Sequence, residues 1–82
     1  MRKSEEPLSG LVKRSFSLAG HRTSVALEPE FWIALERIAT SDRISLSGLV
    51  ARIDAERAGR NLASALRVYV LARALGGAPI PP

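Results

Sequence analysis

Two successive patterns between His21 and Ala39 strongly restrict what this chain can fold into. From Arg22 to Leu27 polar and apolar residues alternate, which indicates a β-strand with one buried face. After Pro29 the apolar residues recur at helical spacing, so a helix should follow the strand. A single strand leaves its backbone N–H and C=O groups without partners, and natural proteins manage such edges. What this strand pairs with is therefore the first question about the fold.

The chain has 82 residues and no cysteine, so it should form one small domain without disulfides. Domains of this size bury little surface and often depend on a disulfide, a metal ion or a partner subunit. His21 is the only histidine and the carboxylates are scattered, so no metal site is expected. Association with a second subunit is the remaining source of stability.

Basic residues outnumber acidic ones and give a net charge of +4. Ten of the twelve basic residues are arginine, which binds phosphates and base edges in a two-pronged way. This balance is typical of a nucleic-acid-binding protein, although an acidic protein partner, a membrane surface or a merely soluble basic surface also accounts for it. The sequence shows neither a signal peptide nor a transmembrane stretch, so the cytoplasm is the expected location.

Composition divides the chain into three parts. Residues 1–11 are polar and residues 76–82 are rich in glycine and proline, so we expect both segments to be disordered. Residues 12–75 should form the folded domain.

Three helices are expected within this domain. Pro29 suits the first turn of the first helix, Ser45 is the expected N-cap of the second, and Asn61 that of the third. Gly59 should end the second helix in the left-handed conformation. The third helix, residues 62–75, is apolar on most of its circumference, which predicts burial that one small chain cannot provide. This again favours a partner subunit.

The order of strand, helix, short turn and helix in "RTSVALEPEFWIALERIATSDRISLSGLVARI", residues 22–53, resembles the ribbon-helix-helix family of DNA-binding proteins of the Arc and MetJ type. More narrowly, "FSLAGHRTSVALEPEFW" with "RNLASALRVYVL" is similar to a group of short, mostly uncharacterised bacterial members with an added C-terminal helix. The resemblance implies a mainly α fold with a short β element. It also implies a homodimer in which the strand pairs antiparallel with its own copy, and the resulting ribbon enters the DNA major groove.

The resemblance also implies which residues contact DNA. The base-reading side of the strand falls on Arg22, Ser24 and Ala26, and Ala26 can offer only an apolar contact. The backbone N–H groups that bind a phosphate at the start of the second helix fall on Ser45, Leu46 and Ser47. Further phosphate contacts are expected from Arg43, Lys13 and Arg14, although these could equally be solvated charges.

One feature of the sequence opposes simple groove binding. Phe16 and Leu18 would share the buried face of the strand if Ala19 and Gly20 formed a two-residue hairpin turn, with Phe16 opposite Thr23. The apolar pattern thus favours a hairpin or a bulge over one continuous strand. A hairpin in each subunit would widen the sheet to four strands, which do not fit a groove about 12 Å wide.

The sequence therefore predicts a homodimeric DNA-binding transcription regulator, most simply a repressor. The alternative is a non-enzymatic dimeric protein-interaction module, similar to an antitoxin, that grips a partner through its C-terminal helix. An open two-stranded ribbon would favour DNA, and a widened sheet would favour the protein partner. With one histidine, no cysteine and no plausible carboxylate pair, we expect neither an enzyme nor a cofactor.

Overall fold

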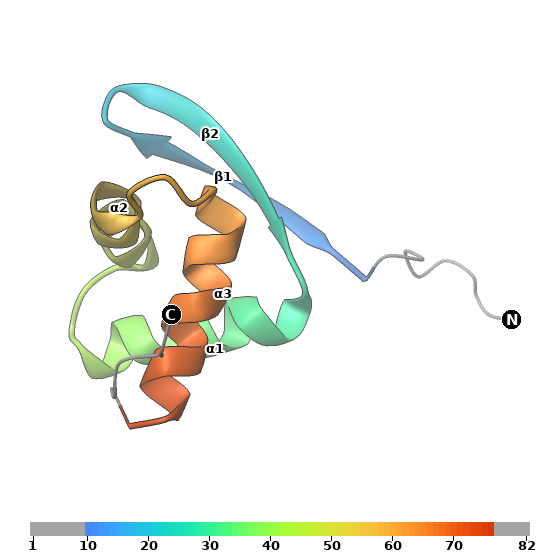
Figure 1. Ribbon diagram of the computed structural model, residues 1–82, viewed down its shortest axis with the longest axis vertical. Helices are drawn as coiled ribbons and strands as arrows, with labels where there is room; N and C mark the ends of the chain where they lie inside the picture. The colour runs from blue at the N-terminus through green and yellow to red at the C-terminus, as the bar shows by residue number, and fades with distance from the viewer. Residues whose placement is uncertain (1–9, 77–82) are drawn as a thin grey trace, which may run out of the picture.

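The computed structural model describes residues 10–76, which form a β-hairpin and three helices (Figure 1). In chain order the elements are β1 (Val12–Leu18), β2 (His21–Leu27), α1 (Pro29–Ser41), α2 (Leu46–Glu56) and α3 (Leu62–Ala74). The fold is mainly helical with a short β element, as expected. The segments for which we expected disorder, residues 1–11 and 76–82, lie outside the described residues except for positions 10, 11 and 76.

The two strands pair antiparallel within one chain, which confirms the hairpin interpretation. Phe16 lies opposite Thr23 and Leu18 lies opposite His21, in the register that the apolar pattern predicted. Ala19 and Gly20 connect the strands, and both have positive φ angles, 52° and 83°. Positive φ at both central residues is what a type I′ turn requires, and this turn matches the twist of a hairpin.

The partner of β2 on one of its edges is therefore β1 of the same chain. The ribbon between two subunits, which the family resemblance implied, would have to form on the other edge and stays a prediction. Together with β1 it would give the four-stranded sheet considered above.

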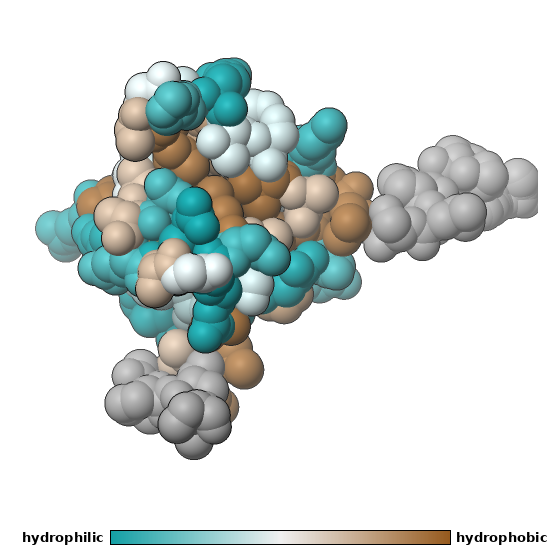
Figure 2. Space-filling model, turned by 45° about the horizontal axis from the view of Figure 1, so that its top comes forward, coloured by the Kyte–Doolittle hydropathy of each residue, from teal (hydrophilic) through white to brown (hydrophobic). Residues whose placement is uncertain are grey.

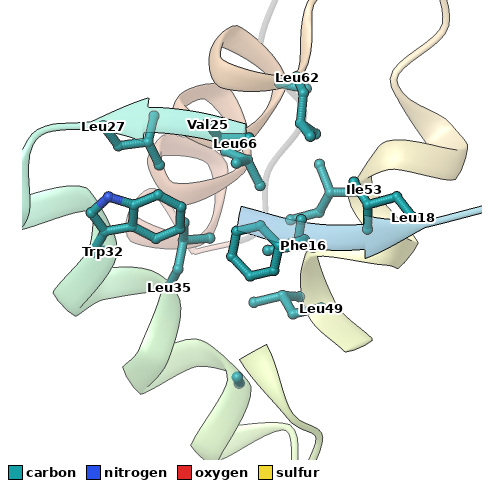
Figure 3. Packing of buried hydrophobic residues seen from close by; sticks show 13 residues of the cluster. Phe16, Leu18, Val25, Leu27, Trp32, Leu35, Leu49, Ile53, Leu62 and Leu66 are labelled. Carbon is teal, nitrogen blue, oxygen red and sulfur yellow. The ribbon is translucent and has the colours of Figure 1, made fainter. Parts of the chain in front are cut away.

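The inner face of the hairpin lies over the helices and supplies a large part of the core (Figure 3). Phe16 packs against Trp32 of α1 with ring centroids 5.8 Å apart. The indole Nε1 of Trp32 donates a hydrogen bond to the carbonyl oxygen of Val12 at 2.8 Å, so its one polar group is satisfied. Leu49 of α2 and Leu66 of α3 are completely buried in the same cluster. All five elements thus share one core.

Helix α3 is buried on one side within the single chain. Leu62, Ala65 and Leu66 are buried against the core, but Leu71 and Leu75 remain 49% and 59% exposed. The hairpin, α1 and α2 are enough to cover one side of this helix within a single chain. One chain by itself therefore leaves the outer side of α3 uncovered, and its burial by a partner subunit stays a prediction.

The predicted helix starts are confirmed. Pro29 is the first residue of α1. The Ser45 hydroxyl accepts a hydrogen bond from the Gly48 amide at 2.9 Å, and the Asn61 side chain accepts one from the Ser64 amide at 2.8 Å. Each side chain satisfies one of the N–H groups that a helix start leaves unpaired.

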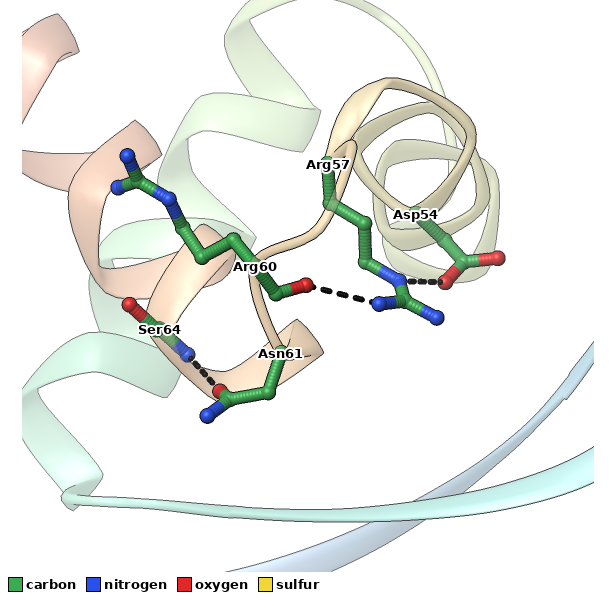
Figure 4. A network of polar contacts seen from close by, with 5 residues as sticks. All are labelled: Asp54, Arg57, Arg60, Asn61 and Ser64. Carbon is green, nitrogen blue, oxygen red and sulfur yellow. Dashed lines mark hydrogen bonds and ion pairs between the residues drawn. The ribbon is translucent and has the colours of Figure 1, made fainter.

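The end of α2 differs from the prediction. The left-handed residue is Ala58, with φ of 57°, and not Gly59. Arg57 holds this turn by donating from Nε to Asp54 at 2.7 Å and from Nη1 to the carbonyl oxygen of Arg60 at 2.8 Å (Figure 4). These contacts hold the turn in place although an alanine occupies its left-handed position, which costs about 1–2 kcal/mol.

Candidate nucleic-acid interface

The face of the hairpin that points away from the helices is polar and positively charged. We call it the outer face. It consists of Lys13, Ser15 and Ser17 of β1 and of Arg22, Ser24 and Ala26 of β2, which the strand register places opposite one another in three pairs. All six are exposed except Ala26, which is half-buried. Two cations and no carboxylate lie on this face, so an anionic ligand would meet no repulsion there.

Two hydrogen bonds cross the outer face. The hydroxyls of Ser15 and Ser24 lie 3.0 Å apart, and Nη1 of Arg22 donates to the hydroxyl of Ser17 at 3.2 Å. The second bond is long and engages only one guanidinium nitrogen, so the remaining N–H groups of Arg22 stay available for a base edge or a phosphate.

Figure 2 turns the hairpin end of the molecule toward the viewer. Hydrophilic residues are spread over much of this side, with apolar residues visible between them. By the strand register, the three predicted base-reading residues share this one surface. Ser15 and Ser17 belong to the same surface and were not among the predicted contacts, although the hairpin register that places Phe16 inside also places both serines outside.

Arg14, in contrast, does not lie on the outer face. Its Nη1 donates to Glu36 of α1 at 2.7 Å, and its guanidinium carbon lies 5.1 Å from the centroid of the Trp32 ring. The structure therefore separates Lys13 from Arg14, and the guanidinium of Arg14 already has an anionic partner. This placement does not favour the predicted phosphate contact of Arg14.

The other predicted phosphate contacts lie at the start of α2. Ser45 caps this helix, and Leu46 and Ser47 form its first turn, where backbone N–H groups point outward along the axis. Arg43 precedes them in a left-handed conformation with φ of 62°; its side chain is exposed and has no partner among residues 10–76. Figure 1 shows the α1–α2 turn and α2 on the side of the hairpin that the helices cover, so one chain does not bring these groups onto the outer face.

Arg67 of α3 contacts the junction between β2 and α1. Its Nε donates to the carboxylate of Glu28 at 3.0 Å, and its guanidinium lies 5.7 Å from the Phe31 ring centroid. The pKa of Glu28 is lowered, first by a hydrogen bond from its own backbone amide and then by the bond from Arg67. The carboxylate thus stays ionised at the N-cap of α1, where the helix dipole favours negative charge.

Arg73, six residues further along α3, contacts the other end of α1. It donates two hydrogen bonds to Asp42 and one, at 3.0 Å, to the Tyr69 hydroxyl. The hydrogen bonds from Arg73 lower the pKa of Asp42. Neither contact is predicted by a local sequence pattern; the only signal is the presence of two arginines in a largely apolar helix.

This chain has an antiparallel two-stranded ribbon followed by two helices with a short turn between them. That order of elements places it among small ribbon-and-helix domains. Residues 11–74 match the sequence profile of the ribbon-helix-helix domain, and the chain belongs to this family. Ribbon-helix-helix domains are typically found in DNA-binding transcription regulators, and they generally dimerise. Comparisons with curated proteins and with solved structures give no match.

Among the residues that the structure describes, no three acidic or histidine side chains gather as they would around a metal ion. Between residues 10 and 76 no helix is long and apolar enough to cross a membrane.

Proposed function

We propose that this protein is a DNA-binding transcription regulator, acting as a repressor and as a homodimer in a bacterial cytoplasm. The main support for the proposal is the outer face, which is the exposed, positively charged surface of a two-stranded ribbon without carboxylates. The chain also belongs to a family whose ribbons bind DNA. A two-stranded ribbon fits the major groove, which is about 12 Å wide.

The outer face offers two kinds of contact. Arg22 can donate in a two-pronged way to O6 and N7 of a guanine, Ser24 can hydrogen-bond to a base edge, and Ala26 can touch a thymine methyl group. Lys13, at the open end of the hairpin, is suited to a phosphate. Base contacts would give specificity, and phosphate contacts would give affinity that falls with salt.

The proposed homodimer does not have to be built through the ribbon. Each chain already contains a complete two-stranded ribbon, and pairing through the free edge of β2 would produce four strands, too wide for the groove. We therefore propose that the two chains present two separate ribbons. The start of α2, with Arg43, Ser45, Leu46 and Ser47, would act as a further phosphate site that supports binding without reading bases.

Fluorescence anisotropy with labelled duplex DNA tests the outer face. The double variant Lys13→Ala/Arg22→Ala removes both cations of this face and should weaken binding strongly. The matched control Arg52→Ala/Arg60→Ala removes two exposed cations that have no ion-pair partner elsewhere in the described chain, and it should affect binding less. Equal losses in both variants, or a wild type that binds no duplex at about 50 mM salt, would argue against the proposal.

The alternative is an antitoxin-like protein-interaction module. The observation in its favour is the hairpin itself, because a sheet of four strands in a β2-paired dimer could not enter the groove. A wild type without affinity for duplex DNA, in a dimer held together through β2, would support this second function.

A further inference from the structure

The two strands of the hairpin carry the same pattern of side chains. In chain order, VKRSFSL of β1 and HRTSVAL of β2 both have a cation at the second place, a serine at the fourth, a small residue at the sixth and apolar residues at the fifth and seventh. Burial follows the same order, since the fifth and seventh residues of each strand are buried and the first, second and fourth are exposed. The two strands are therefore equivalent in pattern although they differ in sequence.

The strand register converts this equivalence into a pseudo-two-fold symmetry. Ser15 and Ser24, the fourth residues of the two strands, lie opposite each other, and their hydroxyls are 3.0 Å apart. Because the strands run antiparallel, a two-fold axis perpendicular to the sheet at this pair superposes each strand on the other. On the outer face the axis exchanges Lys13 with Arg22. The two cations of the outer face thus occupy equivalent places.

A ribbon built from two identical chains would have the same symmetry, because a two-fold axis relates the contributions of two copies. Here one chain supplies both strands, and the strands are covalently joined by the turn at Ala19 and Gly20. The outer face of a single hairpin therefore offers a complete, two-sided set of contacts without a strand from another subunit.

The pseudo-symmetry refines the role of Lys13, which the outer face alone suits to a phosphate. Lysine and arginine can both donate to O6 and N7 of a guanine. Lys13 lies opposite Ala26, whose side chain has no acceptor, and Lys13 forms no ion pair with any side chain among residues 10–76. Its ammonium group is therefore free to make on one half of a DNA site the contact that Arg22 makes on the other.

The register also gives the spacing of the two contacts. Arg22 lies opposite Ser17, which is four residues along β1 from Lys13. At about 3.4 Å per residue, the two cations are about 14 Å apart along the ribbon. Successive base pairs are about 3.4 Å apart, so this separation spans about four base-pair steps. Two-fold symmetry in a protein is mirrored by the DNA site, which places the two contacted bases on opposite DNA strands.

We propose that a single hairpin reads a pseudo-palindromic DNA site, in which Arg22 and Lys13 contact two guanines on opposite DNA strands, about four base-pair steps apart. The inference rests on the proposed DNA binding and adds to it the unit that reads, a base contact for Lys13 and the form of the site. It does not depend on how two chains associate, because each ribbon is complete by itself.

Selection from a random pool of duplexes with the wild-type protein should return a motif with two dyad-related guanines. Fluorescence anisotropy at fixed salt then compares three duplexes that keep both guanines, one or neither, with adenine as the replacement. Wild type should lose at least about fivefold in affinity at each replacement, because each removes a two-pronged contact. Lys13→Ala and Arg22→Ala should each show only one of these two losses, and the double variant should show neither.

Two further variants complete the test. Lys13→Arg keeps a donor at this place and should retain both losses. Arg60→Ala removes an exposed cation outside the outer face and should retain both losses as well.

The outcomes separate this inference from the proposed function. If Lys13→Ala weakens binding to all three duplexes by the same factor and keeps both losses, Lys13 contacts a phosphate, and the inference is wrong while the proposed function stands. A selected motif without dyad-related guanines would overturn the inference in the same way. A wild type that binds no duplex at about 50 mM salt would refute the proposed function and the inference together.

Discussion

Arg73 of α3 donates two hydrogen bonds to Asp42, the C-cap residue of α1. The distance from Nη1 to Oδ2 is 2.8 Å, and that from Nη2 to Oδ1 is 3.0 Å. Arg67 on the same helix binds Glu28, the N-cap residue of α1. The added helix therefore fixes both ends of α1, and with them the point where β2 ends and the turn that leads to Arg43. Helix α3 therefore holds α1 in position in addition to filling part of the core.

The contact with Arg73 makes stability depend on pH at acid values. The pKa of Asp42 is lowered from the ordinary value of 3.8, because the hydrogen bonds from Arg73 favour the charged form. A carboxylate with a lowered pKa stabilises the fold above its ordinary pKa, and this contribution disappears as the pH falls toward the lowered value. Asp42→Asn should therefore lower Tm near neutral pH, and the difference from wild type should shrink below about pH 4.

Thermal melts between about pH 2.5 and pH 7 measure this difference. Glu56→Gln provides the control, since Glu56 is exposed and has no ion-pair partner within the described part of the chain. A constant Tm difference between Asp42→Asn and wild type over the whole range would contradict the assignment.

A substitution in the hairpin turn should raise the stability of the protein instead of lowering it. Ala19 occupies a left-handed position with φ of 52°, which asparagine tolerates better than alanine does. Ala19→Asn should stabilise the protein by about 0.5–1 kcal/mol and raise Tm by about 2–8 °C. Calorimetry measures this. A lower Tm would indicate that residues 12–27 form one continuous strand, in which asparagine is disfavoured.

Burial on α3 can be tested with two substitutions to the same residue. Leu66 is completely buried, so Leu66→Asp places an unpaired charge in the core and should cost at least about 3–5 kcal/mol, enough to unfold a small domain. Leu71 on the same helix is 49% exposed, and Leu71→Asp should change stability by less than about 1 kcal/mol. Circular dichroism during urea unfolding compares them. Equal destabilisation would mean that the outer side of α3 is covered as well.

Much of the fold could be predicted because local rules agreed with one another. The alternation that places Phe16 and Val25 on one face, the glycine at position 20 and the caps at Ser45 and Asn61 all act over a few residues, so the sequence displays them directly. The outer face follows from the same alternation, which is why Arg22 was placed correctly on an exposed surface.

The remaining features depend on contacts between residues far apart in the chain. Arg14 and Lys13 are neighbouring cations on opposite faces of β1. The pairing of Arg14 with Glu36 occurs because α1 lies beneath β1. The contacts of Arg67 and Arg73 depend in the same way on how α3 crosses α1. Ala58 takes the left-handed position next to a glycine because Arg57 ties the turn to α2, which no local preference indicates.

The two classes of DNA contact that we propose should respond differently to mutation. Arg22 lies on the outer face, whereas Arg43 lies beside a helix start, a place that suits a phosphate. If Arg22 reads a base, Arg22→Ala should remove a two-pronged contact worth about 1–3 kcal/mol per half-site and relax the preference for the cognate sequence. Arg43→Ala should weaken binding to cognate and random DNA alike. It should also flatten the log–log salt dependence by about 0.9 for each phosphate that is no longer neutralised.

Titrations of both variants against cognate and random duplexes at several salt concentrations separate these effects. A cognate sequence can be obtained first by selection from a random duplex pool with the wild-type protein. Loss of preference in Arg43→Ala, with an unchanged preference in Arg22→Ala, would reverse the two assignments and place the base-reading surface at the start of α2. Because that surface is not part of the outer face, such a result would leave the outer face free for a protein partner.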